Sequence, residues 1–238
     1  MVKTAIKFTL IALSVIFLTP FGIAALVFSL LGLKKLMTFL MYKLAQGWAH
    51  SLLWLSGCEI TVSGRENIPK KGGICFVCNH QSIFDIIMNL AFIGRPFGFI
   101  AKKELLFLPF LNAWIFILGG LFIDRNNPRK GLKTINSGIK RLKNGASILI
   151  FPEGSRSKGQ GLMPFKPGSF KLAIQSGVPV VPVAVSGTYE AYEKNHRLES
   201  VPVRIVFGAP ISIEDIPHEN RKQILADRAR EVIEAGLR

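Results

Sequence analysis

The chain has 238 residues, of which 30 are basic and 15 acidic, so its formal net charge at neutral pH is +15. Its mean hydropathy of +0.36 is high for a soluble domain, and apolar and basic character together indicate an anionic partner: a membrane surface, a phosphorylated substrate or nucleic acid. Its three cysteines give no disulfide framework, which argues against a secreted, disulfide-built fold and is compatible with the cytosol.

An uncharged apolar stretch runs from Phe8 to Leu33, between Lys7 and the pair Lys34-Lys35. As a helix it is long enough to span about 30 Å of hydrocarbon, although we expect Pro20 to kink or break it. Positive charge at both ends favours a kinked, re-entrant or monotopic hairpin, with both ends in the cytosol, over a single span. Residues 36–57 then form a second apolar helix suited to the membrane interface.

Two alternatives exist for this N-terminal segment. A cleaved signal peptide would use Lys3 and Lys7 as its basic region and residues 22–25 as its cleavage site, but the apolar stretch exceeds the roughly 7–15 residues of such a signal. A true transmembrane span is the main rival, and the sequence leaves it open. We therefore divide the chain into membrane-anchoring helices at 1–57 and a second domain at 58–238.

Beyond residue 58, short strand-like runs alternate with longer helical patterns, as in an α/β fold with a mixed central sheet covered by helices. The clearest helix is 128–143, where Leu132, Ile135, Ile139 and Leu142 share one face. The expected strands are 60–62, 73–77, 97–101, 121–123, 146–151, 180–185 and 201–207. The expected helices are 82–93, 109–118, 128–143, 170–175 and 221–237.

Residues 78–85, CNHQSIFD, follow the apolar strand 73–77 and lead into an expected helix. His80 would lie in the loop at the carboxyl end of that strand, where α/β folds place their ligand sites. Asp85, in the first helical turn, could hold one imidazole nitrogen and leave the other as a base.

The same residues have two other interpretations. Ser82-Ile83-Phe84-Asp85 has the form of a capping box, so Asp85 could simply cap the helix and His80 could be an ordinary loop residue. Cys75, Cys78 and His80 could be zinc ligands, but there is no fourth ligand at a suitable spacing, and the two cysteines would point to opposite faces of a strand.

Basic residues beside glycines occur in three later stretches: 119–125, 151–157 and 164–171. Glycine lets a backbone approach a ligand closely, and arginine binds phosphate through two parallel hydrogen bonds. Each stretch alone could be a solvated loop, whereas together they could form an anion pocket next to His80.

Four of these segments occur in an order that resembles the four motifs of the glycerolipid acyltransferase family. They are Asn79-His80-(four residues)-Asp85, Gly120–Arg125, Phe151-Pro152-Glu153-Gly154-Ser155-Arg156 and Val178–Val183. The resemblance covers about residues 60–210, and the apolar N-terminus also fits the family. Four motifs in order are a specific signal, and none departs from the family pattern.

The resemblance implies an enzyme of phospholipid biosynthesis that acylates the 2-hydroxyl of lysophosphatidic acid and forms phosphatidic acid. His80 would be the general base and Asp85 would orient it, without an acyl-enzyme. The thioester donor would be acyl-carrier protein or acyl-CoA, used as a co-substrate, with no other cofactor and no metal. The substrate-binding residues would be Lys102, with Lys103 as its neighbour, and Arg125, Glu153, Gly154 and Arg156.

The substrate and the product are lipids, so the resemblance places the enzyme at the bacterial inner membrane, with its catalytic domain on the cytoplasmic face and anionic lipid as a partner. The tetrahedral oxyanion would be bound by backbone amides near Gly154 or near the helix start at Ser82. Glycerol 3-phosphate or another lysophospholipid is an alternative acceptor. A non-catalytic protein that binds anionic lipid is an alternative function, while a nucleic-acid binder does not explain Phe8–Leu33.

Overall fold

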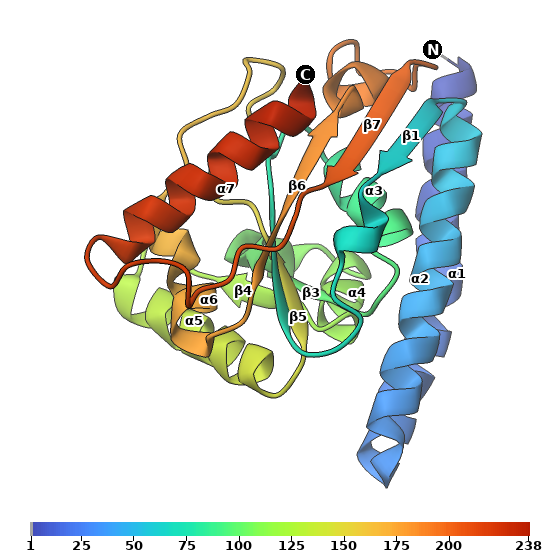
Figure 1. Cartoon of the computed structure of the whole chain (residues 1–238). Helices are drawn as coiled ribbons and strands as arrows, with labels where there is room; N and C mark the ends of the chain where they lie inside the picture. The colour runs from blue at the N-terminus through green and yellow to red at the C-terminus, as the bar shows by residue number, and fades with distance from the viewer. Residues whose placement is uncertain (1) are drawn as a thin grey trace.

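The computed structural model describes residues 2–238, with side chains for residues 9–11 and 13–238, and its centre is a seven-stranded mixed sheet (Figure 1). The strand order is β1-β7-β6-β2-β5-β3-β4. Only the β6–β7 pair is antiparallel among the strand pairs of these residues. The strands are β1 (Glu59–Ser63), β2 (Ile74–Cys78), β3 (Gly98–Lys102), β4 (Leu121–Ile123), β5 (Ser147–Ile150), β6 (Val180–Ser186) and β7 (Pro202–Phe207).

The centre of the sheet is parallel and buried on both faces. Every residue of β2 and of β5 is buried, which explains why these strands are apolar runs rather than alternating patterns. The carboxyl ends of β2 and β5 therefore lie side by side at one edge of the sheet. The predicted mixed α/β sheet is confirmed, and each predicted strand overlaps an observed one.

Helices cover both faces of the sheet and form two apolar clusters with it (Figure 1). One cluster joins the sheet to α2, α3 and α4, and the other joins it to α5, α6 and α7. The helix bounds are α3 (Phe84–Phe92), α4 (Leu111–Ile117), α5 (Pro128–Lys143), α6 (Lys171–Ser176) and α7 (Arg221–Leu237). Short helical turns occur at η2 (Arg65–Asn67), η3 (Lys103–Phe107), η4 (Pro167–Phe170) and η5 (Tyr189–Glu193).

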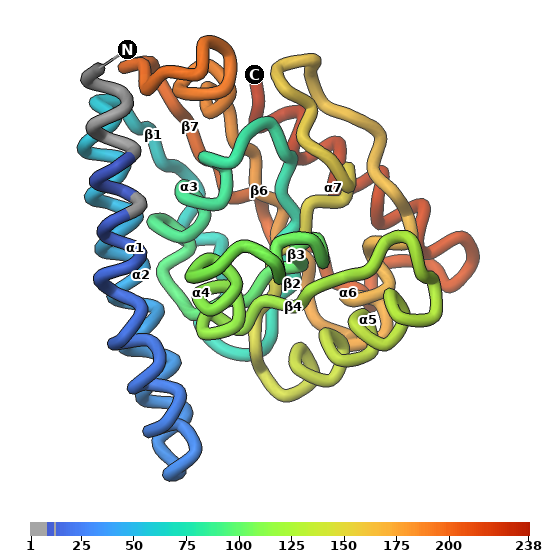
Figure 2. The backbone as a smooth tube through the Cα atoms, turned by 180° about the vertical axis from the view of Figure 1, so that it is seen from behind, coloured from blue at the N-terminus to red at the C-terminus, as the bar shows by residue number. Residues whose placement is uncertain are grey.

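The N-terminus forms the predicted helical hairpin, in which α1 (Val2–Phe28) and α2 (Lys34–Ser56) lie antiparallel (Figures 1 and 2). The reversal occurs in η1 (Ser29–Leu33), where Gly32 has a φ of +90° that side chains rarely adopt. Across the hairpin, the Trp48 indole N–H donates to Ser14 Oγ at 2.9 Å. The stretch Thr9–Ser56 is long and apolar enough to cross a membrane, judged by length and composition, and the turn at Gly32 divides it into two halves.

The expectation that Pro20 kinks or breaks the first helix is wrong for the break, because α1 runs from Val2 to Phe28 with Pro20 inside it. The change of direction is made at Gly32 instead, where the backbone conformation requires a glycine. Next to the proline, the Thr19 hydroxyl donates to the Val15 carbonyl at 2.7 Å, so one of the backbone acceptors in this turn has a side-chain partner.

The second helix of the hairpin is part of the domain core. Tyr42, Ala45, Ala49 and Leu53 of α2 are buried in the same cluster as Phe76 of β2. The two alanines let α2 approach the domain closely, and α2 packs mainly on α3. The division of the chain at residues 57 and 58 stays a prediction.

Candidate active site

The site lies at the edge of the sheet where β2 and β5 end side by side. The loop after β2 carries His80, and the loop after β5 carries Glu153 and Ser157. Two hydrogen bonds join the loops: the Ser157 N–H donates to the His80 carbonyl at 2.7 Å, and the His80 N–H donates to Glu153 Oε1 at 2.6 Å. The backbone on both sides of the His80 side chain is therefore fixed.

His80 and Asp85 form the predicted pair, with His80 Nδ1 and Asp85 Oδ2 2.8 Å apart. The Asp85 side chain is fully buried, whereas that of His80 is 16% exposed. An ionised carboxylate only accepts hydrogen bonds, so Nδ1 carries the proton and Nε2 keeps its lone pair. The geometry thus gives a partly accessible imidazole whose second nitrogen is ready to act as a base.

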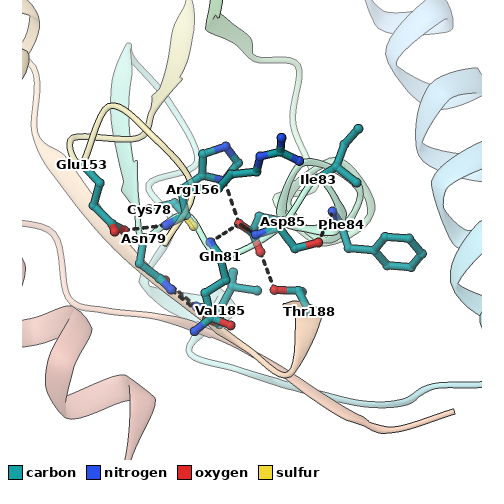
Figure 3. Close-up of polar contacts among 12 residues, drawn as sticks. Cys78, Asn79, Gln81, Ile83, Phe84, Asp85, Glu153, Arg156, Val185 and Thr188 are labelled. Atoms are coloured by element: carbon teal, nitrogen blue, oxygen red, sulfur yellow. Dashed lines mark hydrogen bonds and ion pairs between the residues drawn. The ribbon is translucent and has the colours of Figure 1, made fainter. Parts of the chain in front are cut away.

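Asp85 has three further donors, of which Gln81 and Thr188 are labelled in Figure 3. Its Oδ2 accepts the N–H groups of Gln81 at 2.7 Å and Ser82 at 2.9 Å, and its Oδ1 accepts the Thr188 hydroxyl at 2.5 Å. The bond to Ser82 is the acidic half of a capping box, and the same oxygen also contacts the imidazole, so the cap does not exclude the His80–Asp85 pair. The orienting role of Asp85 stays a prediction. One carboxylate closes the start of α3 and holds the imidazole.

The imidazole is also held from the side. Its ring stacks on the ring of Phe151, with centroids 4.0 Å apart and planes 20° apart. Phe151 directly follows β5, so the strand pairing that brings the loops together also supplies this contact. The Asp85 bond and the stacking contact together restrict the ring to one plane.

Asn79 ties the same turn to the neighbouring strand β6. Its side-chain amide donates to the Val185 carbonyl at 2.9 Å, and its oxygen accepts the Val185 N–H at 2.8 Å. The Asn79 side chain thus makes the two hydrogen bonds to β6 that the backbone of one more residue of β2 would otherwise make. Thr188 lies three residues beyond Val185, so this bond also helps to position the hydroxyl that contacts Asp85.

Glu153 faces the protein rather than the solvent and is 2% exposed. Its Oε1 accepts the His80 N–H and its Oε2 accepts the Met163 N–H at 3.2 Å. Burial raises the pKa of Glu153, and these two hydrogen bonds oppose that shift. Its predicted contact with substrate stays a prediction, while the structure shows it supporting the His80 loop.

Arg125 reaches the loop that follows β5, where its guanidinium donates to the Gly154 carbonyl. Gly154 has a φ of +78°, and a Cβ built on it would lie 2.7 Å from Lys166 Nζ. Arg125 and Lys166 are both exposed, so two cations flank this glycine. Arg125, Gly154, Glu153 and His80 therefore belong to one connected group of residues, as the sequence predicted.

Arg156 is exposed but paired, with its Nη1 2.7 Å from Glu193 Oε1 (Figure 3 shows Arg156 beside the start of α3). The same Glu193 oxygen accepts the N–H of Ile83 at 2.9 Å and lies 3.4 Å from Ser82 Oγ. The guanidinium has four further N–H groups with which to meet an anion. Glu193 thus joins Arg156 to the helix that carries Asp85.

Lys102 and Lys103 lie at the end of β3, further from the imidazole along the sheet edge. Lys102 is 58% exposed and 3.5 Å from Glu104. Lys103 Nζ lies 2.9 Å from Asp124 Oδ2, and this hydrogen bond lowers the pKa of Asp124 and raises that of Lys103. Lys102 remains the freer cation of the two, in line with its prediction as the phosphate ligand.

Two of the three cysteines lie in the core behind this site. Cys75 and Cys78 belong to different apolar clusters, on the two faces of β2, as expected in the argument against a shared zinc site. Burial raises the pKa of Cys75 to about 12, and burial together with the Asp85 charge raises that of Cys78. Both thiols are therefore neutral core groups.

Sequence reasoning missed Thr188 and Glu193, which contact the dyad turn from the segment after β6. The available signal was positional, because Gly187 and Thr188 follow β6, a strand that points the same way as β2. In a parallel sheet, the polar residues that follow the strands all lie at the same edge, where the carboxyl ends of the strands meet.

Comparison with known proteins gives this arrangement a family. The family model described as Acyltransferase matches residues 59–186, the segment that holds the dyad, both loops and strand β6. The chain belongs to the acyltransferase family. The resemblance inferred from the four motifs is thereby confirmed.

Several relatives carry the name 1-acyl-sn-glycerol-3-phosphate acyltransferase. The protein of Borreliella burgdorferi is 35% identical over 161 residues, which is 68% of this chain and 61% of the relative, so the chain spans under two thirds of that protein. The protein of Salmonella typhimurium is 33% identical over 173 residues, 72% of this chain and 70% of the relative. The Escherichia coli protein is 33% identical over 184 residues, 77% and 74% of the two chains.

The crystal structure of PlsC from Thermotoga maritima, a 1-acyl-sn-glycerophosphate acyltransferase, superimposes with a TM-score of 0.80. Its sequence is 28% identical, and the match covers 98% of this chain and 95% of PlsC. The likeness therefore extends beyond the matched family domain to almost the whole chain, including the N-terminal hairpin.

Proposed function

We propose that the protein transfers an acyl group from a thioester donor to the 2-hydroxyl of lysophosphatidic acid and releases phosphatidic acid. The observation that carries this proposal is the His80–Asp85 pair, with an oriented imidazole at the edge of a cationic loop cluster. The names of the relatives support the same reaction.

The chemistry needs a base because an alcohol is a weak nucleophile at neutral pH. In the proposed step, His80 Nε2 takes the proton from the acceptor hydroxyl as its oxygen attacks the thioester carbonyl carbon. The tetrahedral intermediate then collapses, the carbon–sulfur bond breaks, and the leaving sulfur takes the proton from His80, so that a free thiol departs and the imidazole is neutral again. The buried Asp85 stabilises the imidazolium that forms between these steps.

The acceptor phosphate would bind the cationic side chains around the loop that follows β5. Arg125 and Arg156 are exposed on the two sides of Gly154 and Ser155, and Lys102 is exposed on the neighbouring strand end. Arginine contacts phosphate through paired N–H groups, whereas lysine acts as a point charge. Arg156 would keep its Nη1 bond to Glu193 and use its remaining donors.

The backbone donors expected for the oxyanion need revision. The N–H groups of Ser82, Ile83 and Phe84 already donate to Asp85, Glu193 and Ser82 Oγ, and that of Gly154 donates to the Phe151 carbonyl at 3.1 Å. We propose the next two amides, Ser155 and Arg156, which are exposed in the same loop and have no acceptor within the described part of the chain.

The apolar hairpin would hold the enzyme at the bilayer, where both lipid substrates are found. Leu30 and Leu31 at its tip are 87% and 71% exposed, which is costly in water and favourable in lipid. We propose a monotopic insertion at the cytoplasmic face of the bacterial inner membrane. Basic residues near anionic lipid add about 1 kcal/mol each.

The test is acyl transfer by the full chain in detergent or vesicles, with acyl-CoA and with acyl-carrier protein as alternative donors. His80→Ala should abolish transfer and leave the fold intact, whereas His218→Ala, at an exposed histidine of another loop, should retain it. Activity that survives His80→Ala would refute the general-base role. A native chain that acylates glycerol 3-phosphate but not lysophosphatidic acid would refute the proposed acceptor.

A further inference from the structure

The segment between β3 and β4 exposes an apolar surface that the reaction does not explain. We call it the η3–α4 patch, and it consists of Leu106, Phe107, Leu108, Phe110, Leu111 and Phe116. Phe107 is 82% exposed and Phe116 is 60% exposed. Large apolar side chains gathered in one short surface segment mark a binding surface more often than isolated ones do.

The segment that carries the patch is held in a fixed position by contacts with the rest of the domain. The opposite face of α4 is buried through Trp114, Ile115 and Ile117, and the Asn112 side chain donates to the Leu106 carbonyl at 2.8 Å. Phe110 starts the helix with a φ of +62°, a conformation that is rare and strained for a bulky residue. Helix α4 is therefore anchored on one side while phenylalanines are held in solvent on the other.

The patch adjoins the membrane hairpin. The Trp114 indole N–H donates to Thr19 Oγ1 at 3.2 Å, and a Cβ on Gly22 would lie only 2.5 Å from Ile117 Cδ1. Helix α4 is thus seated against the middle of α1, as Figure 2 shows. On α1, Phe17 is 70% exposed and Phe21 is 54% exposed, so exposed apolar side chains occur on both partners of this contact.

The patch also adjoins the cationic part of the site. It begins three residues after Lys103 in the chain, and Lys103 is bonded to Asp124, the neighbour of Arg125. Aromatic and aliphatic side chains next to lysines are the composition of a surface that lies in the headgroup region of an anionic bilayer. A second copy of the chain bound here would explain why the side chains are apolar. It would not explain why the patch lies next to both the hairpin and the cations.

We propose that the η3–α4 patch inserts into the same anionic membrane surface as the hairpin and forms a second membrane contact beside the phosphate-binding cations. The acceptor lipid would then keep its acyl chain in the bilayer while its phosphate reaches Lys102 and Arg125. This second statement rests on the proposed function. The depth of the patch in the membrane is measurable whether or not that reaction is correct.

The direct test is a spin label at Phe107→Cys or Phe116→Cys, in a full chain that also carries Cys58→Ser to remove the half-buried native thiol. The control is Leu132→Cys on α5, which replaces an apolar residue 45% exposed outside the patch. In vesicles of phosphatidylethanolamine and phosphatidylglycerol, patch labels should lie about 5–10 Å below the headgroups. Patch labels should collide more often with oxygen, which dissolves in the bilayer, than with a water-soluble nickel complex. The control label should collide readily with the nickel complex.

Patch labels that collide with the nickel complex as often as the Leu132→Cys label would overturn the proposal. Spin–spin broadening between patch labels would overturn it in favour of a second copy of the chain. A kinetic arm adds Phe107→Ser, for which the KM of vesicle-borne lysophosphatidic acid should rise several-fold. With a short-chain, water-soluble acceptor its kinetics should match those of Leu132→Ser, and an equal defect with both acceptors would count against a membrane role.

Discussion

The turn that carries the dyad and the ring of cations around it are built differently. In the turn, Asp85 accepts four hydrogen bonds, and the backbone on each side of His80 is bonded to the loop after β5. The cations, in contrast, are exposed and make one or two contacts each, with Gly154, Glu193 or Glu104. The proposed proton-transfer groups are set in place before substrate arrives, whereas the proposed phosphate-binding groups still have unused N–H donors.

This difference has a kinetic meaning. A pre-set base contributes to the transition state, so damage to it should lower kcat. A cation that binds the acceptor before and during the reaction stabilises the ground state and the transition state equally. Its removal should therefore mainly raise KM. Of the five substitutions below, those at Asp85, Arg125 and Thr188 test that separation, and those at Glu153 and Asp124 test how the surrounding loops are stabilised. They run from the largest expected effect to the smallest.

Replacing Asp85 by asparagine should have the largest effect. An amide has one acceptor oxygen and directs N–H groups toward donors, so the imidazole loses its orientation and its counter-charge. We expect kcat to fall about 10²- to 10⁴-fold with little change in acceptor KM. The matched control is Asp227→Asn, at an exposed aspartate of α7, which should behave as the native chain. A raised KM with an unchanged kcat would show that Asp85 does not orient the base.

Replacing Arg125 by alanine should weaken binding of the acceptor lipid. A hydrogen bond to a charged group contributes about 1.5–3 kcal/mol, which corresponds to a KM for lysophosphatidic acid raised about tenfold to hundredfold. With monoacylglycerol, which lacks the phosphate, the variant should equal the native chain. Arg129→Ala, at an exposed arginine of α5, provides the control for lost positive charge. An equal loss with both acceptors would mean that Arg125 supports the loop rather than the phosphate.

Replacing Glu153 by glutamine should destabilise the His80 loop, because one of two backbone N–H groups would face an amide donor. An unsatisfied buried group costs about 1–3 kcal/mol. Since the pKa of Glu153 is raised by burial, the folded native chain holds its proton longer than the unfolded chain, and its stability falls as pH rises through that raised pKa.

The glutamine variant lacks this titration, so the difference in melting temperature between the two chains should shrink from about pH 4 to about pH 7. Calorimetry at both pH values measures it. A difference that stays constant would mean that Glu153 does not titrate between these pH values in the folded chain.

Replacing Thr188 by valine removes the hydroxyl that donates to Asp85 and keeps the shape of the side chain. The bond is worth about 1 kcal/mol, so kcat should fall about fivefold to tenfold at unchanged KM. Thr188→Ser restores a hydroxyl and should recover most of the loss. The pH profile of kcat should also shift for valine and not for serine; a serine variant as defective as valine would indicate a packing role instead.

Replacing Asp124 by asparagine should have the smallest effect, because its ion pair with Lys103 is only partly buried and is screened by solvent. The pKa of Asp124 is lowered by the Lys103 hydrogen bond, so the stabilisation is present above the ordinary carboxyl pKa and lost as pH falls through the lowered value. Melting curves should differ slightly at neutral pH and coincide in strong acid. A large difference at neutral pH would mean that Asp124 has a further role in the β4 turn.

Regular elements and the dyad were predictable because their signals are local. Helix α5 begins and ends at the expected residues, since a proline follows the capping residue Asn127 and the apolar residues recur at helical spacing. The pairing of His80 and Asp85 needs only a strand end and one helical turn. Helix α3 starts two residues later than expected, because Ser82 belongs to the capping turn.

Contacts that depend on strand order were not predictable. Thr188 and Glu193 reach the dyad turn because β6 pairs with β2, although more than a hundred residues separate these strands from one another in sequence. Their segment has no regular apolar pattern to attract attention. The inward orientation of Glu153 was missed for the same reason, since its partners are backbone amides brought close by folding.

The burial of α2 in the main core has a consequence for how this protein can exist away from lipid. Tyr42, Ala45, Ala49 and Leu53 complete the cluster around Phe76, so a chain without its first 57 residues would expose apolar surface that no other segment covers. Any lipid or detergent that binds the hairpin also binds the native state preferentially, and so raises the free energy of unfolding of the whole catalytic domain. Binding of lipid to the hairpin and folding are therefore thermodynamically linked, and the hairpin is a structural component of the enzyme as well as its proposed anchor.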